Sequence, residues 1–79
     1  MKFLYYLYVS IGDDWGNSVI YIEEEQAIQA SIRNPNTRVE VFEKTFDFNG
    51  NFNGYLATSN YYKNGILYDN KGNKIETFI

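Results

Sequence analysis

The sequence predicts a two-layer α+β domain, in which an antiparallel sheet of about four to five strands carries one helix on one face. Several segments alternate apolar and polar side chains, as half-buried strands do. Residues 23–33 instead place apolar side chains at helical spacing and stop just before the only proline, Pro35. Turn sequences rich in Gly, Asn and Asp separate these segments. We therefore expect the order β-β-α-β-β-β in a single domain over residues 1–79.

Residues 2–11 form the first expected strand, because they are largely aromatic or β-branched. Alternation gives this strand one strongly apolar face. We expect one face to lie under the helix, with Phe3, Tyr5, Leu7 and Val9. The opposite face then holds Leu4, Tyr6 and Tyr8, together with Phe42 and Phe78 from later strands. Residues 12–17 end the strand in a turn, and residues 18–22 follow as a short strand.

The expected helix at residues 23–33 suits the helix dipole at both ends. Glu23, Glu24 and Glu25 place negative charge at its N-terminus, and Arg33 places positive charge at its C-terminus. One stripe of small and apolar side chains is expected to dock on the sheet, and it includes Ala27, Ile28 and Ile32.

The second half of the chain predicts further strands. Residues 38–44 alternate, so Val39 and Val41 should face the helix. Residues 47–55 contain Asn-Gly twice, which indicates a hairpin or a long loop. Two alternating runs, residues 66–69 and 73–78, flank Asn-Lys-Gly and predict a terminal hairpin.

Composition excludes several classes of function. The chain has 79 residues, no Cys and no His, which removes disulfides, thiolate chemistry and the commonest general base. Its net charge is −3, and residues 13–47 hold eight acidic side chains against three basic ones. A nucleic-acid-binding surface needs clustered cations, so we expect no direct contact with nucleic acid.

The N-terminal apolar run is too short to span a bilayer as a helix. The residues after it, Gly12, Asp13, Asp14 and Trp15, do not match the small residues of a signal-peptide cleavage site. We therefore expect a cytoplasmic protein without membrane contact.

No motif indicates an enzyme, a metal or a cofactor. Asp47, Asn49 and Asn51 match the start of a calcium loop, but Phe52 and Thr58 stand where that loop needs Gly and Glu. Paired carboxylates for hydrolysis have no cleft in so small a domain. We expect no catalysis and no bound ion or cofactor.

Aromatic residues are the remaining signal, at 19% of the chain. One short helix covers one sheet face, so something else must cover the face with Tyr6 and Tyr8. The candidates are residues 46–55 folded back, a second copy of the chain, or a partner protein. The expected partner-binding residues are Tyr6, Tyr8, Asp13, Asp14, Trp15, Glu24 and Phe42.

The composition, rich in Asn, Lys, Ile and Tyr, is typical of small accessory proteins of AT-rich phages and mobile elements. We therefore expect a non-catalytic inhibitor, of the anti-CRISPR kind, that blocks a host protein such as a nucleic-acid-binding effector. The alternative is an oligomeric protein that sequesters a nucleotide-like ligand. Its expected cationic and stacking side chains are Arg33, Arg38, Lys63, Lys71, Tyr61 and Tyr62. A structural domain of a larger assembly is a third hypothesis.

Overall fold

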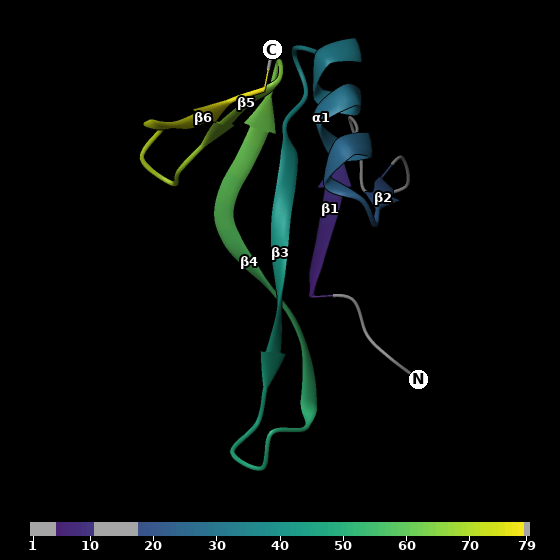
Figure 1. Ribbon diagram of the computed structural model, residues 1–79, viewed down its shortest axis with the longest axis vertical. Helices are drawn as coiled ribbons and strands as arrows, with labels where there is room; N and C mark the ends of the chain where they lie inside the picture. Colours follow the sequence, from purple (N-terminus) through teal and green to yellow (C-terminus); the bar gives the residue numbers. More distant parts are fainter. Residues whose placement is uncertain (1–4, 11–17, 79) are drawn as a thin grey trace.

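The computed structural model describes residues 5–10 and 18–78. Six antiparallel strands form one sheet in the order β2-β1-β3-β4-β5-β6, and a helix packs on one of its faces (Figure 1). The predicted α+β class, an antiparallel sheet with one helix, is confirmed. The sheet has one strand more than the prediction allowed.

The helix α1 spans Glu24–Arg33. The strands are β1 (Tyr6–Ser10), β2 (Val19–Tyr21), β3 (Val39–Phe46), β4 (Phe52–Lys63), β5 (Ile66–Tyr68) and β6 (Lys74–Thr77). The expected short second strand, the helix and the terminal hairpin are all present. Within the described residues, no helix is both long enough and apolar enough to cross a membrane.

The sequence explains both ends of α1. Glu24 and Glu25 lie in the first turn and Arg33 in the last, where each charge opposes the helix dipole. The backbone N–H of Asn34 closes the helix by donating to the carbonyl of Ala30 over 3.0 Å. Pro35 follows and cannot extend the ladder. The buried face of the helix consists of Ala27, Ile28, Ala30 and Ser31.

The expected orientation of β1 is wrong. Tyr8 is only 7% exposed and lies in the core under the helix, whereas we expected it on the opposite face. Antiparallel pairing sets Tyr8 beside Val41 and Leu7 beside Phe42. Because Val41 faces the helix, as predicted, Tyr8 faces it too, and Leu7 shares the outer face with Phe42. The core consists of Tyr8, Ala27, Ile28, Ala30, Val39, Val41 and Tyr62.

Two other aromatic residues also differ from their expected positions. Phe78 packs against this core, with its ring centroid 5.7 Å from that of Tyr62, rather than on the outer face. Tyr5, expected under the helix, is an exposed side chain that donates a hydrogen bond to Glu43 Oε1 over 2.9 Å. Both faces of the first strand are apolar in sequence, so alternation alone could not select the buried one.

β4 is the strand that the sequence analysis missed. It contains Asn, Gly and Ser, which are poor strand formers, and its first residues were expected to be irregular. In the sheet, however, β4 has a neighbour on each side, β3 and β5. The first residues of β4, 52–57, pair with β3 alone, and this long pairing overrides their weak local preference.

The far ends of β3 and β4 form a hairpin arm, residues 43–56, that projects beyond the helix (Figure 1). Phe46 pairs with Phe52 across the arm, and Phe48 in the loop is fully exposed. Residues 46–55 therefore do not fold back over the sheet, and that expectation is wrong. The alternative expectation for this segment, a hairpin, is confirmed.

Two hairpin loops share the sequence Asp-x-x-Gly-Asn and the same hydrogen bonds. In the arm, the Asp47 carboxylate accepts the backbone N–H groups of Asn49 and Asn51, each over 2.9 Å. In the β5–β6 hairpin, Asp69 accepts those of Lys71 and Asn73 over the same distance. The glycines of the two loops have φ of 79° and 81°, the left-handed conformation that this turn requires. Turn chemistry accounts for the calcium-like spacing at Asp47.

Candidate functional site

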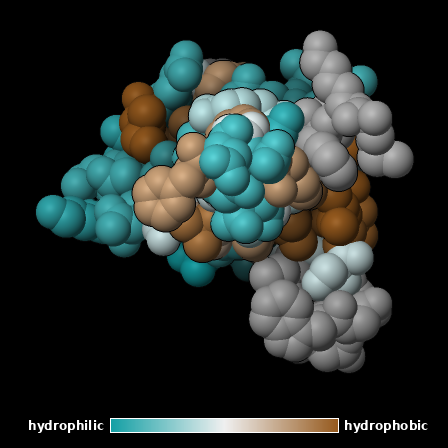
Figure 2. All heavy atoms as spheres, turned by 90° about the horizontal axis from the view of Figure 1, so that it is seen from below, coloured by the Kyte–Doolittle hydropathy of each residue, from teal (hydrophilic) through white to brown (hydrophobic). Residues whose placement is uncertain are grey.

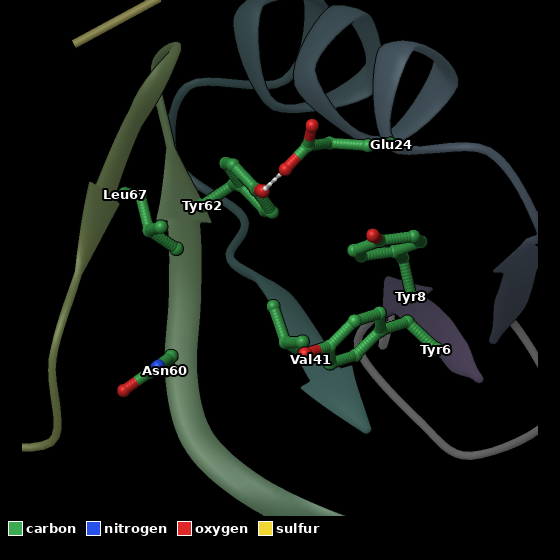
Figure 3. A pocket seen from close by; sticks show the side chains of 7 residues that line it. All are labelled: Tyr6, Tyr8, Glu24, Val41, Asn60, Tyr62 and Leu67. Atoms are coloured by element: carbon green, nitrogen blue, oxygen red, sulfur yellow. Dashed lines mark hydrogen bonds between the residues drawn. The ribbon is translucent and has the colours of Figure 1, made fainter. Parts of the chain in front are cut away.

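A pocket of about 220 Å³ opens beside the start of α1. Side chains from α1, β1, β3, β4 and β5 converge on it (Figure 3). The lining residues are Tyr6, Tyr8, Glu24, Val41, Asn60, Tyr62 and Leu67. The pocket therefore forms where the helix meets the sheet.

The wall of the pocket nearest the helix is a hydrogen-bonded pair. Tyr62 is 2% exposed, and its hydroxyl donates to Glu24 Oε2 over 2.5 Å (Figure 3). Burial raises the pKa of Tyr62 above its usual range, and the hydrogen bond to the Glu24 carboxylate raises it further. The hydroxyl therefore stays protonated and holds the carboxylate in place.

Two more tyrosines continue the wall. The ring of Tyr8 lies 6.0 Å from that of Tyr62, centroid to centroid, at an angle of 60°. Tyr6 comes from the same strand, but it is 43% exposed and stands at the open side of the pocket. Three aromatic rings and one carboxylate thus surround the same space (Figure 3).

A bulge in β4 shapes the lower wall. The register between β3 and β4 shifts between Glu40 and Phe42, so that Thr58, Ser59 and Asn60 stand opposite Val41 alone. Thr58 Oγ1 donates to the carbonyl of Val41 over 2.9 Å and accepts the Asn60 N–H over 3.1 Å. These bonds fix the backbone of the bulge at Asn60, which is one of the lining residues.

Ser59 sits in this bulge with φ of 70°, a left-handed conformation that costs a non-glycine residue about 1–2 kcal/mol. A strained backbone conformation persists only where the surrounding structure enforces it, and such residues cluster at functional sites. The sequence analysis did not identify the bulge. A serine flanked by Thr and Asn gives no local signal for a positive φ.

The charge of the pocket is acidic. Glu24 is the only charged residue among those that line it. Arg38, which we had considered as an anchor for an anionic ligand, instead lies 4.4 Å from the centre of the Tyr61 ring and pairs with Glu40 over 3.2 Å. Arg33 lines a different hollow, beside Tyr21. The pocket therefore does not favour a nucleotide-like anion.

Three of the expected partner-binding residues, Tyr6, Tyr8 and Glu24, meet in the pocket. Phe42 does not join them, because it lies on the other face of the sheet beside Leu7. The remaining three, Asp13, Asp14 and Trp15, lie outside the described residues. Sequence analysis missed Tyr62 and Asn60 as companions of Glu24, since only the fold brings β4 to the start of the helix.

The hairpin arm is a second surface with functional potential. Its exposed apolar side chains are Phe46, Phe48 and Leu56, and Leu56 is 67% exposed. Figure 2 looks onto the end of the molecule that carries the arm, and shows apolar side chains in tan and brown beside the polar loop. Tyr6 and Leu56 are both paired with Glu43, so the arm begins at the rim of the pocket.

Among the described residues, no three Asp or Glu side chains gather as a metal site would need. Comparison of the chain with protein-family models, curated proteins and solved structures finds no match. The function must therefore be argued from the pocket and the arm.

Proposed function

We propose that the protein is a non-catalytic interaction protein that blocks a surface of another protein by stoichiometric binding through the hairpin arm. The observation that supports this function is the exposure of Phe46, Phe48 and Leu56 on an arm that projects beyond the helix. Alternation places Phe46 and Leu56 on opposite faces of the arm, and large apolar side chains exposed on a projecting element are typical of interaction sites.

Two further observations support binding rather than catalysis. The chain contains neither His nor Cys, the residues that most often supply acid–base and nucleophilic groups. The pocket holds about 220 Å³. That is below the roughly 300–1,000 Å³ that ligand sites for larger molecules occupy.

The finer proposal concerns the partner. Acidic residues outnumber basic ones by ten to seven, and the arm itself carries Glu43 and Asp47 beside one basic residue, Lys44. Acidic side chains around an apolar anchor complement a basic surface and speed the encounter with it. We propose a partner that binds nucleic acid, as in an anti-defence inhibitor of the anti-CRISPR kind.

A capture experiment tests the general proposal. The purified protein is immobilised, and bound bacterial proteins are compared with those retained by the Phe48→Ser, Leu56→Ser double variant. Ile75→Ser is the control, because Ile75 is also an exposed apolar residue and lies on β6, outside the arm. A specific partner should bind the wild type and the control in a 1:1 complex. The double variant should bind it about thirtyfold more weakly. Equal retention by all three proteins contradicts the role of the arm.

A cleavage assay tests the finer proposal. Guide-loaded CRISPR effectors are titrated with the protein, and DNA cleavage is measured at each ratio. Inhibition should saturate near one inhibitor per effector and should weaken as salt is raised. Inhibition at a small fraction of that ratio would indicate catalysis. A panel of effectors that are all unaffected contradicts the finer proposal alone.

A further inference from the structure

The pocket combines three tyrosine rings with a single carboxylate, and this combination goes beyond the docking role of the arm. We propose that the pocket is a binding site for an alkylammonium cation, such as a quaternary amine or a methylated lysine side chain. Its walls are the rings of Tyr6, Tyr8 and Tyr62, and its charge is that of Glu24.

The arrangement of the rings supports a cation. The face of an aromatic ring is electron-rich and attracts a cation within about 6 Å of its centroid. The centroids of Tyr8 and Tyr62 are 6.0 Å apart with planes tilted by 60°, and both side chains are almost fully buried, so they form the floor of the pocket, whereas Tyr6, at 43% exposed, offers the accessible ring. Tyr6 closes the exposed side of the same space (Figure 3).

Glu24 supplies the opposite charge in a defined position. Its Oε2 accepts the hydroxyl of Tyr62, which prevents the side chain from swinging freely into water. No lysine or arginine is among the lining residues to neutralise it. A bound cation would therefore form an ion pair with the Glu24 carboxylate.

The remaining walls favour an alkylated head group over a metal ion. Val41 and Leu67 are apolar, and Asn60 is the one neutral amide residue among the lining residues. Calcium needs about six to eight oxygen ligands to replace its water, which these walls do not supply. Methyl groups on nitrogen need no such replacement and gain contact with apolar walls. The size also fits, because about 220 Å³ exceeds the roughly 150 Å³ that accommodates benzene.

An NMR titration with choline chloride tests the proposal on the isolated protein, without any partner. Amide signals of Tyr6, Tyr8 and Tyr62 should shift in a saturable manner. The uncharged isostere 3,3-dimethylbutan-1-ol should cause at least tenfold weaker effects, because it keeps the shape and lacks the charge. Equal binding of the two compounds, or no saturation by about 50 mM choline, would overturn the proposal.

Matched variants localise the binding. Glu24→Gln should weaken choline binding about tenfold, and Glu25→Gln, the next carboxylate on the same helix, should leave it unchanged. Tyr6→Leu should weaken it about five- to thirtyfold, whereas Tyr6→Phe, which keeps the ring, should not. Tyr6 is exposed, so its variants remain informative if Glu24→Gln does not fold. Unchanged affinity in both Glu24→Gln and Tyr6→Leu would overturn the site.

A final pair of ligands distinguishes the two sources of the cation. A trimethyl-lysine peptide that binds more tightly than choline, and more tightly than the unmodified peptide, indicates a protein ligand. The reverse order indicates a free quaternary amine. Either result supports the cation site, and neither depends on the arm. Loss of choline binding would leave the proposed function standing, just as failure of the capture experiment would leave the pocket standing.

Discussion

Ser31 on α1 and Gly65 in the β4–β5 turn are joined by a buried hydrogen bond. The backbone N–H of Gly65 donates to Ser31 Oγ over 3.0 Å, and Ser31 Oγ donates in turn to the carbonyl of Ile28 over 2.7 Å. Ser31 has no exposed surface. One hydroxyl therefore ties the helix to a turn 34 residues away in the chain.

Replacing Ser31 by alanine should lower the free energy of unfolding by about 1–3 kcal/mol, because the buried N–H of Gly65 then has no acceptor. Urea denaturation measures the change. Gln29→Ala is the matched control on the exposed side of the same helix, and it should change stability by less than about 0.5 kcal/mol. Equal stability of Ser31→Ala and the wild type would show that the bond contributes nothing.

Truncation of Tyr8 should destabilise the fold far more than truncation of Tyr6. Tyr8 is in the core, so Tyr8→Ala should cost about 3–5 kcal/mol, as large aromatic truncations do. Tyr6 stands at the rim, so Tyr6→Ala should cost less than about 1 kcal/mol. Thermal melting of the two single variants measures the difference. Similar melting temperatures would contradict the observed orientation of β1.

The pair formed by Tyr62 and Glu24 predicts a loss of stability at high pH. The folded protein raises the pKa of Tyr62 above its ordinary value of 10.0 through burial and the hydrogen bond to Glu24. Above about pH 10 the unfolded chain loses this proton while the folded protein keeps it, so ionisation favours unfolding. The stabilisation is thus complete below pH 10 and declines above it, by about 1.4 kcal/mol per pH unit for one such group. Urea midpoints between pH 8 and 11.5 should fall less steeply in Tyr62→Phe than in the wild type.

The Asp47 carboxylate should act through its turn and not through an ion. Asp47→Ala removes the acceptor for two backbone N–H groups, so the melting temperature should drop. Asp47→Asn keeps an acceptor oxygen and should stay close to the wild type. Adding millimolar calcium should change none of the three melting curves. A rise of several degrees in the wild type alone would contradict the turn interpretation.

Substitution of Ser59, the strained residue in the β4 bulge, should stabilise the protein. Ser59→Gly should raise the free energy of unfolding by up to about 1 kcal/mol, because glycine adopts a φ of 70° without steric cost. Ser10→Gly in the regular strand β1 should instead lower it by about 0.5–1 kcal/mol. Chemical denaturation of both variants provides the test. If both substitutions destabilise equally, the conformation at Ser59 is not strained.

Local signals in the sequence were sufficient for the elements with strong boundaries. Pro35 and the acidic first turn located α1 to within one residue, and Asn70-Lys71-Gly72 located the terminal hairpin. The start of β4 contains Asn53 and Gly54, so local preference could not identify a strand that depends on its pairing with β3. Elements with strong local signals could therefore be predicted, whereas the start of β4, which depends on tertiary pairing, could not.

The site was predictable only in part for the same reason. Tyr6, Tyr8 and Glu24 were identified as candidates from the first 25 residues, but their meeting point was not. Tyr62 reaches Glu24 across 38 positions of the chain, and Asn60 depends on the bulge beside it. Contacts of this kind follow from strand register, which alternation could not fix in a strand that is apolar on both faces.

The repeated Asp-x-x-Gly-Asn turns have a consequence for the order of folding. Strands β3 to β6 are linked by three pairings between consecutive strands, and two of their three connections use this turn. Such hairpins close over short loops and form in about 1–10 μs. Tyr6 must find Glu43 across a much longer loop, whose closure costs more entropy. We therefore expect a C-terminal nucleus, with β1 joining late and the tyrosine-lined pocket completed in the last step of folding.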